Sequence, residues 1–100
     1  MPRPDDRIEI QNFTSPGHVQ RVDRTRYTAM REALLAVLPT ELPGLTVAEA
    51  KTALLPLLPE AAFPGGDKAG WWLKAVQLDL EAKGIVARGP RSPVRLFRSA

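Results

Sequence analysis

The sequence contains no cysteine in its 100 residues and a single histidine, His18. The missing thiols exclude disulfides, thiolate zinc sites and cysteine nucleophiles, and one histidine is a poor basis for a transition-metal site. The longest apolar run, Ala33 to Leu38, is far shorter than the roughly 20 residues of a membrane-spanning helix. The opening residues MPRPDDR also lack the apolar stretch of a signal peptide. We therefore expect a cytoplasmic protein with no metal, no other cofactor and no membrane partner.

Patterns typical of catalysis are also missing. His18 stands in PGHV, which is loop sequence, and is interpreted as a surface or satisfied loop histidine rather than a general base. The carboxylate pair Asp79 and Glu81 is expected on a helix surface, outside any pocket that acid–base chemistry would need. The segment Gly65–Gly70 lacks the spacing of a phosphate-binding loop, and we expect Asp67 to cap the helix that follows. The sequence predicts no enzyme.

Charge is distributed unevenly within an ordinary globular composition of 44% hydrophobic and 25% charged residues. Residues 68–98 hold seven basic residues and two acidic ones, and no acid follows Glu81. A basic end of this kind favours a polyanion such as nucleic acid as partner. A solvated tail would give the same composition, so charge alone leaves the two interpretations open.

The first two predicted helices have clear start and stop signals. A helix over 26–38 follows an N-cap at Asp23 or Thr25 and ends before Pro39. In the second helix, Thr46 and Glu49 have the spacing of a capping box. Its buried face continues through Ala50, Leu54 and Leu57 or Leu58, and the connection that follows is expected to place Phe63 in the core.

The third predicted helix begins near Asp67 and ends before Gly84, and it carries two apolar stripes. The main, buried stripe consists of Ala69, Trp72, Leu73, Val76 and Leu80. The second stripe consists of Trp71, Ala75, Leu78 and Ala82, and the polar remainder of Gly70, Lys74, Gln77 and Glu81. Trp72 is predicted to be a core residue. For Trp71, packing beneath the 59–66 loop is slightly favoured over contact with a partner.

Strands are expected at both ends of the chain. Ile85 to Arg88 and Val94 to Arg98 flank the turn sequence GPRSP and predict a hairpin. Near the N-terminus, Ile8 to Gln11 alternates as a short strand does. Residues 1–25 are taken as a partly extended or disordered arm. Because Ile8 and Ile10 need a partner strand, we expect this arm to provide additional pairing between the two chains of a dimer.

Three short helices, the last ending at a glycine and followed by a basic hairpin, give an order that resembles the winged helix-turn-helix superfamily. The segments LTVAEAKTALLP and WWLKAVQLDLEAKGIVARGPRSPVRLFR carry this resemblance. The motifs PGHVQRVD, LPGLT, FPGGDKAGWW and LDLEAKG also look like a small family of uncharacterised bacterial proteins. The resemblance implies an α+β winged-helix domain over residues 26–98: a three-helix bundle with a C-terminal β-hairpin wing and an N-terminal strand as a candidate addition.

The resemblance further implies binding to double-stranded DNA, as a transcriptional regulator or a nucleoid-associated protein that acts as a homodimer. Candidates for the major groove are Lys68, Lys74 and Gln77 on the third helix. Candidates for phosphate or minor-groove contacts are Arg88, Arg91, Arg95 and Arg98 of the wing. All four arginines are expected to be exposed, so their removal should leave the fold intact.

A protein-interaction module with the winged-helix shape is the alternative function. It is supported by Glu81 on the outward face of the third helix and by the second apolar stripe, which offers Trp71 and Leu78 to a protein partner. DNA binding requires a continuous positive face from Lys74 to the wing, whereas a partner site requires a neutral apolar patch around Trp71 and Leu78.

Overall fold

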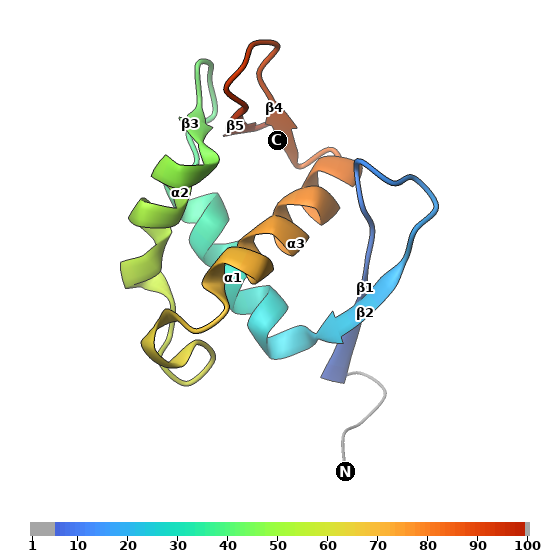
Figure 1. Cartoon of the computed structure of the whole chain (residues 1–100), viewed down its shortest axis with the longest axis vertical. Helices are drawn as coiled ribbons and strands as arrows, with labels where there is room; N and C mark the ends of the chain where they lie inside the picture. Colours follow the sequence, from blue (N-terminus) through green and yellow to red (C-terminus); the bar gives the residue numbers. More distant parts are fainter. Residues whose placement is uncertain (1–5, 100) are drawn as a thin grey trace.

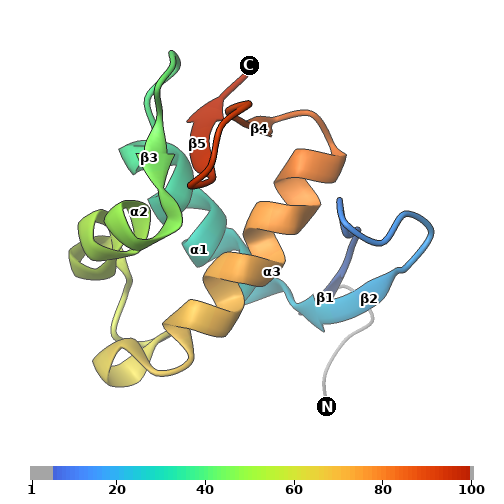
Figure 2. The ribbon, with the colours of Figure 1, turned by 45° about the horizontal axis from the view of Figure 1, so that its top comes forward.

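A computed structural model describes residues 6–99, which form three α-helices and two small antiparallel sheets. The predicted α+β class is confirmed. The elements run in the order β1 (Arg7–Ile10), β2 (Gln20–Asp23), α1 (Arg24–Val37), β3 (Leu45–Thr46), α2 (Val47–Leu54), the 3-10 turns Leu55–Leu57 and Pro64–Gly66, α3 (Ala69–Ala82), β4 (Val86–Arg88) and β5 (Arg95–Arg98). Figures 1 and 2 show α3 running between the β1–β2 hairpin on one side and α2 on the other.

Helix α1 begins two residues earlier than predicted, and Asp23 provides its cap. The Asp23 carboxylate accepts a hydrogen bond from the backbone N–H of Arg26 at 2.9 Å, which satisfies one of the free donors of the first turn. The helix ends at Val37, and Pro39 follows the C-cap residue. Tyr27, Met30 and Leu34 lie on one face of the helix and are all buried.

The capping box of α2 is confirmed in both directions. The Glu49 backbone N–H donates to Thr46 Oγ1 at 3.1 Å, and the Thr46 backbone N–H donates to Glu49 Oε1 at 2.8 Å. These hydrogen bonds to the charged form lower the pKa of Glu49 below its usual range. The buried face of the helix continues through Leu58, which packs against the core, whereas Leu57 is exposed.

Helix α3 begins at Ala69, two residues after Asp67, but the prediction that Asp67 caps it is wrong. Lys68 occupies the N-cap position with a φ of 60°, and no side chain there bonds to the helix. At the other end, Gly84 is left-handed as predicted, with a φ of 76°. The main apolar stripe is buried throughout, and Phe63 packs edge-on against Trp72 with ring centroids 6.3 Å apart.

The C-terminal hairpin of β4 and β5 is confirmed. Together with β3 it forms a three-stranded sheet of order β3-β5-β4. Strand β3 pairs Leu45 with Leu96 beside Gly44. A Cβ atom at Gly44 would lie 2.4 Å from the carbonyl oxygen of Leu96, so this close approach of two backbones requires glycine.

Strand β1 finds its partner within the same chain. Strand β2 pairs Ile8 with Val22 and was not predicted, because QRVD has a single large apolar residue. Ile10 and Val22 are buried in the same core as the three helices. The N-terminal hairpin, in its described part, therefore packs on the helical bundle, and its strands need no second copy to pair. Residues 1–5 of the predicted arm lie outside the described residues.

None of the helices within residues 6–99 combines the length and apolar character needed to cross a membrane.

Candidate functional site

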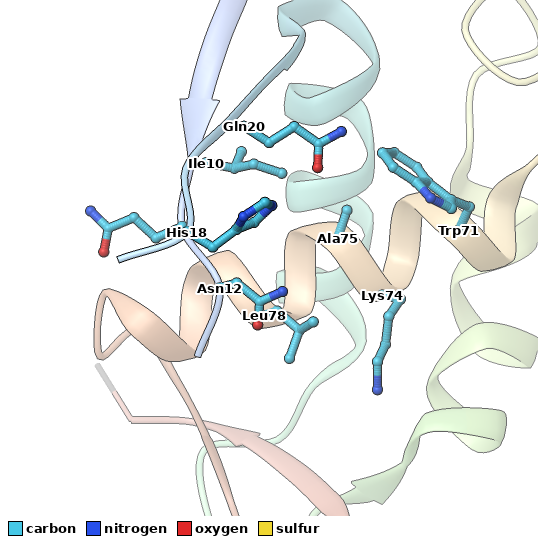
Figure 3. A pocket seen from close by; sticks show the side chains of 9 residues that line it. Ile10, Asn12, His18, Gln20, Trp71, Lys74, Ala75 and Leu78 are labelled. Carbon is cyan, nitrogen blue, oxygen red and sulfur yellow. The ribbon is translucent and has the colours of Figure 1, made fainter. Parts of the chain in front are cut away.

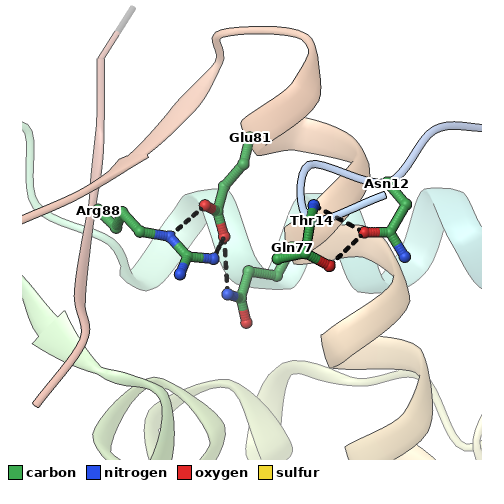
Figure 4. Close-up of polar contacts among 5 residues, drawn as sticks. All are labelled: Asn12, Thr14, Gln77, Glu81 and Arg88. Atoms are coloured by element: carbon green, nitrogen blue, oxygen red, sulfur yellow. Dashed lines mark hydrogen bonds and ion pairs between the residues drawn. The ribbon is translucent and has the colours of Figure 1, made fainter. Parts of the chain in front are cut away.

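Glu81 is buried and paired with Arg88, contrary to its predicted place on the outward face of α3. Its side chain is 1% exposed and accepts hydrogen bonds from Arg88 Nε at 2.7 Å and from the Arg88 guanidinium Nη2 at 3.0 Å (Figure 4). This two-point contact raises the pKa of Arg88. The Phe13 ring lies against the same guanidinium, with its centroid 5.1 Å from Arg88 Cζ. Arg88 thus neutralises a buried acid.

Gln77 belongs to the same buried cluster. It is 1% exposed, and its Nε2 donates to Glu81 Oε1 at 2.7 Å. Its Oε1 has no hydrogen-bond partner among the described residues. Exchanging the two amide atoms would set oxygen against the Glu81 carboxylate, so the Glu81 contact fixes the amide orientation. A contact with a DNA base would require the Gln77 side chain to lie at the surface, and it is buried.

Asp79 is the second acid of α3, and it too is buried rather than on the helix surface as predicted. Its carboxylate is 0% exposed and accepts hydrogen bonds from Tyr27 Oη, from the Gln11 backbone N–H at 2.8 Å and from Lys83 Nζ at 2.9 Å. Burial, together with the hydrogen bond to Asp79, raises the pKa of Tyr27. Asp79 therefore joins α3 to α1 and to the N-terminal hairpin.

The remaining candidate cations differ in their exposure and in their side-chain partners. Lys68, Lys74 and Arg91 are exposed and have no side-chain partner among the described residues. Arg95 lies 3.3 Å from the exposed Glu49 carboxylate, a loose surface pair. Arg98 is half-buried, and its Nε donates to the Leu38 carbonyl at 3.2 Å, which ties β5 to the end of α1.

The second apolar stripe of α3 faces the N-terminal hairpin across a cavity of about 210 Å³. Trp71 is 51% exposed at this cavity, so the slight preference for core packing was wrong, whereas Leu78 is 7% exposed. In Figure 3 the side chains of His18 and Gln20 point from the hairpin toward α3, while Lys74 extends away from them. The remaining lining residues are Ile10, Gln11, Asn12 and Ala75.

The loop before β3 and the wing loop lie side by side at the top of Figure 1. Leu42 and Pro43 from the first loop and the segment 89–93 from the second line a cavity of about 410 Å³. Arg95 also lines it, and Arg91 lies within the 89–93 segment. The described residues contain no group of three or more His, Cys, Asp or Glu side chains placed to hold a metal ion.

A model of one protein family, described as "Family of unknown function (DUF6958)", matches residues 7–96. The chain belongs to this family. The match runs from β1 into β5, so the unit shared by the family includes the N-terminal hairpin as well as the three helices and most of the wing. Comparison with curated proteins finds no match, and comparison with solved structures finds none.

Several residues that shape these sites were missed in the sequence. The i, i+4 spacing of Asp79 and Lys83 is typical of a helical ion pair and is a signal for their contact. Asn12 followed by Thr14 is a turn signal, and the Asn12 side chain does cap that turn. For Gln20, in a strand that was itself unpredicted, the sequence carries no such signal.

Proposed function

We propose that the chain is a nucleic-acid-binding module of winged-helix type, which binds duplex DNA through exposed cations on α3 and the wing. The observation that supports this function is the burial of both acids in residues 68–98. Asp79 and Glu81 each lie against a cation of their own, Lys83 and Arg88. The exposed surface of this segment consequently offers cations without exposed carboxylates of its own, and Glu81 no longer supports the alternative function.

The winged-helix assignment is supported by the order of the elements. A third helix that ends at Gly84 leads into a two-stranded hairpin, and that hairpin is joined by a short strand from before α2. This arrangement puts α3 and the wing next to each other, so both can reach one duplex.

The contact set that we propose consists of Lys68, Lys74, Arg91 and Arg95. Arg88 and Arg98 have structural roles, against Glu81 and the Leu38 carbonyl, and Gln77 is buried. The set is made of cations, which pair with phosphates, and it lacks the amide that α3 was predicted to present to a base. Phosphate contacts position a protein but carry no sequence information. We therefore expect weak sequence discrimination, which suits a nucleoid-associated protein better than an operator-specific regulator.

Fluorescence anisotropy with a labelled duplex of mixed sequence tests this function. The double variant Lys74→Ala, Arg91→Ala should bind more weakly and with a shallower dependence on salt, because it makes two fewer phosphate contacts. Arg21→Ala is the matched control, since it removes an exposed arginine from β2, outside the proposed face. The single variants Lys74→Ala and Arg91→Ala are measured as well, because each removes one charge, as Arg21→Ala does. If Arg21→Ala weakens binding as much as either of them, the loss of affinity comes from net charge and not from the proposed face.

A protein partner remains the second candidate function, and the exposure of Trp71 favours it. Leu78, the other residue predicted for such a patch, is buried, so the apolar surface there is smaller than the sequence indicated. If the folded wild-type protein does not bind duplex DNA at low ionic strength, a protein partner becomes the better proposal.

A further inference from the structure

The cavity between the β1–β2 hairpin and α3 contains an amide whose donors are unused. Asn12 Oδ1 accepts two hydrogen bonds from Thr14, one from the backbone N–H at 2.9 Å and one from Oγ1 at 2.7 Å (Figure 4). The backbone bond fixes the orientation of the amide, because exchanging its atoms would set its N–H groups against the Thr14 backbone N–H, which can only donate. The Asn12 NH₂ group has no hydrogen-bond acceptor among residues 6–99, and Figure 3 shows it directed toward α3. Gln20 offers an exposed amide at the same cavity, where Asn12 is half-buried.

Trp71 places an aromatic ring at the end of this cavity nearest the start of α3. The ring contacts Trp72 edge-on, with centroids 5.2 Å apart and an interplanar angle of 81°, and is half-exposed. Because Trp72 is itself packed in the core, Trp71 is supported on one side while part of its surface stays open. A supported, open indole is a stacking platform for a flat ring.

The charge of the cavity favours an anionic ligand. Among the residues that line it, Lys74 is the charged side chain and no carboxylate is present. Lys74 extends away from the cavity floor, where it could meet a phosphate attached to a ring held inside (Figure 3). The volume of about 210 Å³ is below the roughly 300 Å³ at which pockets for drug-sized ligands begin, so a single ring system fits better than a larger molecule.

We propose that this cavity binds a nucleobase, stacked on Trp71 and hydrogen-bonded by Asn12 and Gln20. Indole stacking and amide contacts to a base edge are the means by which proteins recognise unpaired bases. The inference rests on the proposed function, since the ligand would be a base bulged or flipped out of the duplex held by α3 and the wing. A free nucleotide carries the same chemistry and is the other source. Polar amides on one wall and a buried Leu78 on the other argue against an apolar protein segment as the occupant.

The experiment compares three labelled duplexes of the same sequence: one fully paired, one with a single bulged adenine and one with an abasic bulge. The abasic bulge separates recognition of the base from a preference for a flexible duplex. In a second arm, AMP is titrated while tryptophan fluorescence is followed. The variants are Trp71→Ala, Trp71→Phe and Asn12→Asp, which keeps the acceptor for Thr14 but removes the free donor. Leu57→Ala, at an exposed apolar residue outside the cavity lining, is the control.

We expect the bulged adenine to bind roughly 5- to 140-fold more tightly than the abasic bulge, the range that stacking of one base supplies. Trp71→Ala should abolish this preference, Trp71→Phe should keep part of it, Asn12→Asp should reduce it and Leu57→Ala should leave it unchanged. The other supporting outcome is that AMP quenches tryptophan fluorescence in the wild type and not in Trp71→Phe, while the bulged adenine gives no preference. That result would support the pocket and identify the free nucleotide as its ligand.

Equal affinity for the two bulges, together with fluorescence that AMP leaves unchanged, would overturn the proposed pocket. Salt-dependent binding to the paired duplex would in that case still support the proposed function. If no duplex binds at low ionic strength, the proposed function fails, and the AMP arm alone decides the pocket. If AMP fails as well, both proposals are overturned, and the exposed face of Trp71 is better assigned to a protein partner.

Discussion

Replacement of Arg88 by alanine should destabilise the fold strongly, which was not expected for a wing arginine from the sequence. The change would leave the Glu81 carboxylate, 1% exposed, with Gln77 Nε2 as its remaining side-chain donor. Removing one partner of a buried ion pair costs about 3–5 kcal/mol. Because the Arg88 side chain is itself 30% exposed, its removal lets water approach Glu81, so we expect the lower end, about 3 kcal/mol. That is a large part of the roughly 5–15 kcal/mol that stabilises a typical domain.

Urea denaturation followed by circular dichroism measures this effect as a change in the free energy of unfolding. Arg91→Ala is the matched comparison, since it removes the same side chain from the exposed wing loop and should change stability by less than about 0.5 kcal/mol. Adding Glu81→Gln to Arg88→Ala should recover part of the loss, because the buried charge is removed. A free energy of unfolding for Arg88→Ala within about 0.5 kcal/mol of wild type would refute the reasoning.

Three further predictions concern the caps, the tryptophans and the tyrosine. Thr46→Ala should cost roughly 0.5–2 kcal/mol through loss of the cap acceptor, and an unchanged urea midpoint would contradict the role of the capping box. Trp72→Ala should cost about 3–5 kcal/mol and the half-exposed Trp71→Ala clearly less, so equal losses on denaturation would contradict the assigned burial. Tyr27 is the one tyrosine in the sequence, so phenolate absorbance reports it alone. Its raised pKa means that the folded state retains the proton, and the associated stability should be present below about pH 10 and be lost as pH rises above it. Titration of the folded protein at the ordinary tyrosine pKa, or an alkaline stability loss as large in Tyr27→Phe as in the wild type, would contradict this.

Elements set by local chemistry could be predicted from the sequence. The Thr46–Glu49 capping box, the stop at Pro39 and the left-handed Gly84 depend on residues within one helical turn of each other. The wing hairpin likewise follows from a turn sequence between two short strands. Strand β2 escaped prediction because its pairing with Ile8 and Ile10 crosses a loop, and its own four residues lack the alternation of a strand.

The polar residues of α3 were misplaced for a different reason. Glu81 and Asp79 look like solvent-facing residues because the partners that cover them come from other elements, beside the local contacts with Gln77 and Lys83. Arg88 comes from β4, and Tyr27 is 52 residues from Asp79 in sequence. The spacing of residues in a helix predicts which side chains share a face, but it does not predict that a guanidinium or a phenol from another element covers that face. The same limit applies to Trp71, whose exposure depends on where the N-terminal hairpin lies.

The salt dependence of duplex binding tests the central proposal most directly. If Lys68, Lys74, Arg91 and Arg95 each meet one phosphate, the slope of log affinity against log salt should be about −3.6. Replacing all four by alanine should flatten that slope nearly to zero while the protein stays folded, because Arg88 is left in place to neutralise Glu81. A wild-type protein that is folded and binds no duplex at low ionic strength, or a slope that the four replacements leave unchanged, would contradict the account.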